Sequence, residues 1–236
     1  MRNRIVAAAV VLALTTLSPR AWADQVHQVQ FNFSGLQSGP SNLRAPRGGP
    51  VTDSGGPVDG MQGEVDDGVF GPLAIIGGAL SFATPNPTSV LDYPPGYFNY
   101  FAAGGGSLTL TGSVLGLTAG SSLLTATFAP AIPPPYPSTT NVFVDPTSGL
   151  IDFAGLLNVT WVNPVLLSDL GAGNINYFGF GTVSVTQSRN GDGSLGTVRG
   201  ITALLVVTPE PGTAFLFGAA LLGIMAGWLR RGWRQV

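Results

Sequence analysis

Several runs within residues 24–208 alternate apolar and polar residues with a period of two, and this pattern constrains the fold more than any other feature. Successive side chains of a β-strand point to opposite faces of its sheet, so the alternation predicts strands with one solvated face. The clearest runs are 29–33, 108–111, 124–128, 157–161 and 201–207. The last run is apolar at almost every position, which predicts a strand that is central in its sheet or covered on both sides.

Three further features complete the predicted fold. The apolar positions change phase across Gly181, which predicts a β-bulge. Residues 34–63 are rich in Gly, Pro and Ser without periodicity, which predicts a long mobile loop. No amphipathic helix is evident between residues 24 and 208. About nine to eleven short strands therefore predict an all-β domain, a β-sandwich of the jelly-roll or immunoglobulin-like kind.

The first 23 residues have the three parts of a secretory signal peptide. Arg2 and Arg4 come first, an apolar run follows at 5–17, and small residues surround Trp22 before the predicted cleavage site after Ala23. The apolar run is too short for a bilayer core, which needs about 20 helical residues. Export through the Sec route follows from this interpretation, and an uncleaved N-terminal anchor is the alternative.

The C-terminal end of the chain carries a second membrane-targeting segment. An uncharged segment at 212–229 is long enough, at about 1.5 Å per residue, to form a transmembrane helix. Basic residues stay on the cytoplasmic side, so the body is predicted outside and the C-terminus in the cytoplasm. The Pro-Glu-Pro motif that precedes the segment is Pro209, Glu210 and Pro211, and the basic cluster that follows it is Arg230, Arg231 and Arg234.

Motif, uncharged segment and arginine cluster, in this order, resemble a PEP-CTERM sorting signal over residues 209–236. Such tails are found on exported proteins of Gram-negative bacteria that possess an exosortase. The resemblance implies that the tail holds the precursor transiently in the inner membrane until exosortase, its processing partner, cuts near Pro209, Glu210 and Pro211. The body at 24–208 would then reach the cell surface or extracellular matrix. An ordinary single-pass anchor is the alternative.

Composition and charge argue against several classes of function. The body has four arginines against eleven acidic residues, a formal charge of −7, which disfavours nucleic acid as a partner. The chain has no Cys, no Lys and one histidine, His27, so cysteine nucleophiles, Schiff bases and standard zinc sites are excluded. These absences predict a protein that is not an enzyme and has no cofactor.

One motif imitates a nucleotide site. Residues 191–196 match G-x-G-x-x-G, but the segment that follows has the pattern of a strand, whereas the dinucleotide fingerprint requires a helix there. The Asn-Gly and Asp-Gly pairs at 190–193 instead predict a hairpin turn.

Two clusters could bind a ligand. Aromatic residues are densest at 93–101, where Tyr93, Tyr97 and Tyr100 are predicted sugar contacts, for an exopolysaccharide for example; core and edge packing is the alternative. Carboxylates gather at Glu64, Asp66 and Asp67, which could hold Ca²⁺, or form a solvated acidic turn.

The sequence therefore predicts a non-enzymatic exported surface or matrix protein. The alternative is a lectin-like module that binds carbohydrate, with or without Ca²⁺. An extracellular hydrolase has less support, because the acids are scattered singly and no G-x-S-x-G is present.

Overall fold

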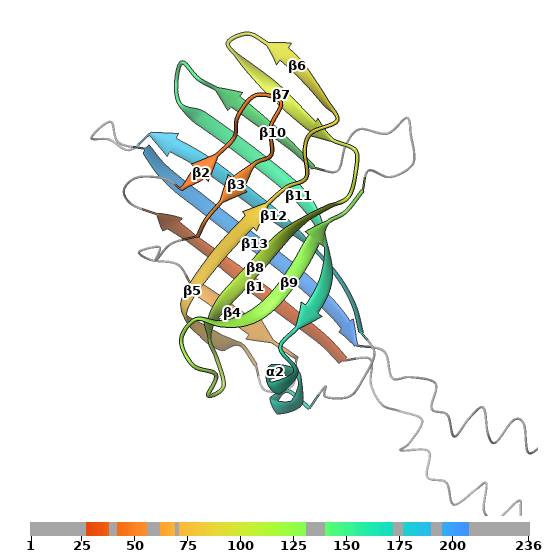
Figure 1. The fold of residues 1–236 in the computed structure, drawn as a ribbon. Coiled ribbons are helices and arrows are strands. Elements are labelled where there is room, and N and C mark those ends of the chain that lie inside the picture. Colours follow the sequence, from red (N-terminus) through yellow and green to blue (C-terminus); the bar gives the residue numbers. More distant parts are fainter. Residues whose placement is uncertain are drawn as a thin grey trace, which may run out of the picture. The chain divides into compact units, whose positions relative to one another are not determined.

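The computed structural model describes residues 27–37, 42–55, 62–68, 71–130, 140–171, 177–189 and 195–207 (Figure 1). Residues Gln28–Val207 form one compact unit. Within these described ranges the strands are β1 (His27–Gln37), β2 (Leu43–Arg44), β3 (Thr52–Asp53), β4 (Gln62–Asp66), β5 (Leu73–Ala83), β6 (Ser89–Tyr93), β7 (Gly96–Phe101), β8 (Gly105–Ser113), β9 (Ser121–Phe128), β10 (Thr140–Asp145), β11 (Leu150–Val162), β12 (Tyr177–Arg189) and β13 (Leu195–Val207), and they include one short helix, α2 (Pro164–Asp169).

The strands form a single sheet that closes on itself. Its order is β12-β13-β1-β4-β5-β8-β9-β11, and an additional pairing of β11 with β12 completes the ring. The 13-residue β11 shares one edge between two neighbours, because its first half pairs with β10 and its second half with β9. Strands β10, β7 and β6 thereby extend the sheet beyond the ring (Figure 1).

The all-β prediction is confirmed, but the arrangement differs from the predicted sandwich. A sandwich has two separate sheets, whereas here one hydrogen-bonded path connects all neighbouring strands of the ring. The predicted alternation holds within the strands: Val29, Phe31 and Phe33 of β1 are buried. The inward side chains form one core, in which Phe82 stacks on Phe153 at 5.0 Å between ring centroids.

Two local predictions were wrong. The register of β12 against both β11 and β13 runs without interruption through Gly181, so there is no bulge at that position. The apolar phase changes there because Phe180 faces outward with half its surface exposed, while Val183 and Val185 face the core. The helix α2 was also missed, although Asn163 as N-cap followed by Pro164 is a recognisable helix start.

The predicted mobile loop at 34–63 contains ordered structure. Residues 42–55 include β2 and β3, and Leu43, Val51 and Asp53 in this segment are buried. Strand β3 pairs with the end of β5 at 82–83, whereas β4 pairs with the start of β5 at 73–75. The segment therefore belongs to the folded unit, and 38–41 and 56–61 within the predicted loop lie outside the described residues.

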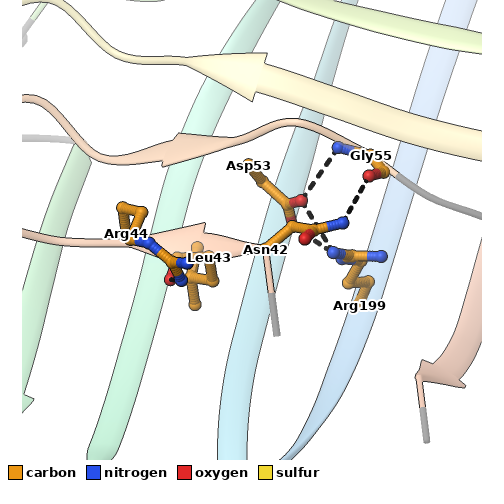
Figure 2. Close-up of polar contacts among 6 residues, drawn as sticks. All are labelled: Asn42, Leu43, Arg44, Asp53, Gly55 and Arg199. Atoms are coloured by element: carbon orange, nitrogen blue, oxygen red, sulfur yellow. Dashed lines mark hydrogen bonds and ion pairs between the residues drawn. The ribbon is translucent and has the colours of Figure 1, made fainter. Parts of the chain in front are cut away.

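A buried ion pair joins this segment to the opposite strand β13 (Figure 2). Arg199 Nε and Nη2 donate to the two carboxylate oxygens of Asp53 at 2.6 and 2.7 Å, and both side chains are fully buried. Asp53 Oδ1 also accepts from the backbone N–H of Gly55, and the Asn42 amide donates to the Gly55 carbonyl. Arg199 Nη1 has no hydrogen-bond partner in the described part of the chain.

No helix among the described residues is long and apolar enough to cross a membrane. The predicted span at 212–229 and the predicted signal peptide at 1–23 lie outside the described residues.

Candidate functional site

Aromatic side chains cover the outward face of the sheet extension formed by β6, β7 and β10. The Phe98 ring lies 4.6 Å from that of Phe143, 6.0 Å from that of Tyr93 and 6.1 Å from that of Tyr100, measured between centroids. We call Leu91, Tyr93, Phe98, Tyr100 and Phe143 the aromatic face.

Strand register explains why these residues meet. Phe98 of β7 lies opposite Leu91 of β6 on one side and opposite Phe143 of β10 on the other, which places the three side chains in one row. Residues two apart along a strand share a face, so Tyr93 and Tyr100 join the same surface. Leu91 is 52% and Tyr93 59% exposed, because β6 is the last strand of the extension. Such clustering of exposed apolar area indicates a contact surface.

Tyr97 does not belong to this surface. It lies three residues from Tyr100 on the same strand and therefore on the opposite face, where its hydroxyl donates to the Ala45 carbonyl. Burial raises the pKa of Tyr97, and the positive charge of Arg47 opposes that rise. Of the three predicted sugar contacts, Tyr93 and Tyr100 thus lie together and Tyr97 lies apart. Phe143 was missed, although the alternation at 140–145 places it on a wet face.

The opposite face of β7 holds the 45–49 segment in place. Asn99, fully buried, donates to the carbonyls of Pro46 and Gly49 at 2.9 and 3.2 Å and accepts from the Gly48 N–H at 3.0 Å. The aromatic face is therefore supported from behind by a hydrogen-bonded layer.

An exposed ion pair adds a connection at the edge of this layer. Arg47 Nε and Nη2 donate to both oxygens of Asp92 at 2.9 and 2.7 Å. The hydrogen bond from Arg47, together with its charge, holds the pKa of Asp92 below its usual range and outweighs the effect of desolvation. The same hydrogen bond raises the pKa of Arg47.

A shallow hollow of about 530 Å³ lies on the outward face of β11, β12 and β13. Register places its residues in two rows across the three strands, one of Leu156, Thr182 and Thr202 and one of Asn158, Phe180 and Leu204. Gln30, Ala129, Leu157 and Gly181 complete the lining, which contains no charged residue. The prediction that this strand is central or covered on both sides is confirmed in its first form, since β13 lies between β12 and β1 in the sheet, while its outer face is open here, with Thr202 exposed and Leu204 half-buried.

The predicted calcium ligands are not brought together. Glu64 and Asp66 share the outward face of β4, whereas Asp67 is buried. Glu64 accepts from the Asn32 amide at 3.2 Å, and Asp66 accepts from the Gly68 N–H at 2.8 Å. Within the described ranges, no three His, Asp or Glu side chains form a group that could hold a metal ion. The local geometry is that of an acidic turn closing onto its own backbone.

The remaining predicted residues fall at the ends of strands or outside the described part. His27 is the first residue of β1. The pairing of Arg189 with Leu195 confirms that 190–194 connect two antiparallel strands, with β13 following the glycine motif as a strand. The predicted sorting residues Pro209, Glu210 and Pro211 and the basic cluster Arg230, Arg231 and Arg234 lie outside the described residues.

Comparison with known proteins identifies one feature of the chain. The family model described as the PEP-CTERM protein-sorting motif matches residues 207–231. The chain thus carries the sorting motif that the resemblance predicted, and its match begins at Val207, the last residue of β13. No curated protein and no solved structure gives a significant match.

Proposed function

We propose that this chain is the precursor of a non-enzymatic exported protein, which exosortase releases from the inner membrane to the cell surface or extracellular matrix. The observation that carries the proposal is the PEP-CTERM protein-sorting motif at 207–231. Such a motif implies export and exosortase processing, and its prolines at 209 and 211 favour extended backbone that an enzyme can bind.

The position of the motif relative to the fold supports this role. Strand β13 lies between β12 and β1 in the closed sheet, and all 13 of its residues are paired in register with β12. A cut after Val207 leaves every described strand in the released body. Processing therefore removes the C-terminal membrane-targeting tail without removing any described strand from the folded unit.

A genetic comparison tests the processing step. In the parent strain we expect a body shortened at its C-terminus in the extracellular fraction, and in an exosortase-null strain we expect tail-bearing protein in the membrane fraction. Glu210→Ala should reproduce the null strain if the motif is the recognition element, while Glu64→Ala, a carboxylate on β4, should be processed normally. Tail-bearing protein in both strains would make the tail a permanent anchor.

The aromatic face favours carbohydrate binding as a second function. Tyr93 is exposed and the rings of Phe98, Tyr100 and Phe143 are half-buried on the same face, so together they offer flat apolar surface, to which the two tyrosines add hydroxyls. The body's formal charge of −7 favours a neutral polysaccharide over an acidic one.

Affinity electrophoresis in gels containing neutral polysaccharides tests this second function. We expect Tyr93→Ala to reduce retardation several-fold, because Tyr93 is 59% exposed and its loss should leave the fold intact. Tyr97→Phe, on the opposite face, is the matched control and should be retarded like the unsubstituted protein. EDTA should change nothing. Equal retardation of both variants would exclude the aromatic face as the sugar site.

A further inference from the structure

One end of the closed sheet is defined by the last residue before the sorting motif. Val207 of β13 lies opposite Tyr177 of β12, and at the same end β11 leads into α2. The turn between β8 and β9 is also there, because Val162 of β11 lies opposite Leu124 of β9. We call this the tail end (Figure 1).

Five of the nine exposed large hydrophobic side chains among the described residues lie toward the tail end. Trp161 on β11 is 37% exposed, Val165 on α2 is 52% exposed, and Phe180 on β12 is 50% exposed. Ile76, which lies opposite Ser113 at the end of β8, is 69% exposed, and Leu115 in the β8–β9 turn is 40% exposed. These five side chains come from different elements, so folding brings them to one end of the sheet.

The β8–β9 turn presents its leucine in an unusual way. Leu115 has a φ of 48° and Gly116 a φ of 83°. Positive φ at two consecutive turn positions favours Asn and Gly and is rare for a leucine. The turn nonetheless places a leucine here with 40% of its surface exposed, so an apolar side chain is available to solvent or lipid at this turn.

Charge is distributed unevenly between the two ends. Arg44, Arg47 and Arg199 lie in the half away from the tail end, as does position 189 at the end of β12. The described charges toward the tail end are acidic, including Asp66 and Asp169. Electrostatic attraction of the tail end to anionic lipids is therefore disfavoured, and the tail end would bind a membrane through burial of its apolar side chains.

Chain length limits how far the tail end can lie from the membrane. Four residues, 208–211, separate Val207 from the uncharged segment at 212–229. At most about 3.6 Å per residue, they span about 14 Å. The headgroup layer accounts for about 5–8 Å on each side of the hydrocarbon core. When this segment spans the bilayer, Val207 therefore lies no farther than about 14 Å from the hydrocarbon core, which is within or just outside the headgroup layer.

We propose that the tail end is a membrane-contacting surface, and that Trp161, Val165 and Leu115 enter the lipid interface while the precursor is anchored. Tryptophan prefers this depth because it has an apolar ring and a polar N–H. The inference rests on the proposed function, since it needs the tail to be embedded. After cleavage near the motif, only these few side chains would still contact the lipid. This weak contact favours release of the body from the membrane.

Quenching of tryptophan fluorescence by brominated lipid tests the contact in the full chain. The four tryptophans are Trp22, Trp161, Trp228 and Trp233, so W22F, W228F and W233F together leave Trp161 as the reporter. In the W161F version of this protein, Val165→Trp gives a second reporter at the tail end, and Tyr93→Trp gives a matched exposed control at the far end. The protein is reconstituted into phosphatidylcholine vesicles with and without brominated acyl chains.

We expect quenching at positions 161 and 165 to exceed quenching at position 93 several-fold. If the protein floats with the vesicles but all three positions are quenched equally, the proposal that the tail end contacts the membrane is wrong. The proposal that the tail is embedded in the membrane is then still supported. If the protein does not float, the embedded tail is wrong and this inference falls with it.

Discussion

Replacing Asp53 with alanine should destabilise the folded body by about 3–5 kcal/mol, because it leaves the charge of Arg199 buried without a partner. Both side chains of the pair are fully buried, and the carboxylate accepts two hydrogen bonds from the guanidinium. Loss of the pair also frees the 42–55 segment from β13. Chemical denaturation of the tail-less body at neutral pH measures the change, with Asp152→Ala as control.

Asp152 is an exposed carboxylate on β11 that accepts one hydrogen bond from Thr186, so its loss should cost less than about 1 kcal/mol. The double variant D53L/R199M should recover most of the stability lost in D53A. It removes both charges and also the Arg199 Nη1 donor, which has no partner among the described residues. A D53A variant as stable as D152A would show that the pair is not buried in solution.

Replacing Asn99 with alanine should cost about 2–4 kcal/mol, because the fully buried amide makes three hydrogen bonds to the 45–49 segment and all three are lost. The Asn99 amide donates to the carbonyls of Pro46 and Gly49 and accepts from the Gly48 N–H, and an alanine side chain can make none of these hydrogen bonds. The 45–49 segment should then separate from β7, and amide hydrogen exchange at Gly48 should become faster. Equilibrium denaturation and hydrogen exchange measure the two effects.

Asn141 provides the matched control for Asn99. It lies on the neighbouring strand β10, opposite Tyr100, and is half-buried on the outward side. Asn141→Ala should change stability by no more than about 0.5 kcal/mol. Equal losses for the two variants would mean that Asn99 contributes through strand propensity and not through the support of the 45–49 segment.

The period-two alternation identified β1, β8, β9, β11 and β13, since it directly reports which side chains face a core. It carries no information about which strands are neighbours, and closure of the sheet depends on contacts between β13 and β1 at opposite ends of the body. The same limit applies to residues 42–55. Their buried residues Leu43, Val51 and Asp53 are isolated in a Gly/Pro-rich stretch, and their place is fixed by Asn99 and Arg199 far along the chain.

The candidate site was partly predictable from spacing. Tyr97 and Tyr100 are three apart in a strand, which places them on opposite faces, so parity alone separates them. Phe180 illustrates the reverse case. Its position out of phase with Val183 and Val185 was interpreted as a bulge, whereas the unbroken register shows an aromatic side chain turned toward solvent. An aromatic residue out of phase with a core pattern can thus mark a surface contact.

The identity of the C-terminal residue on the exported protein tests the central claim most directly. Mass spectrometry of the C-terminal peptide of the cell-surface or extracellular form should show a new terminus near Pro209, Glu210 and Pro211, with every residue of β13 through Val207 retained. A form that still ends at Val236 would contradict processing at the PEP-CTERM motif, and a terminus within β13 would contradict release of an intact closed sheet.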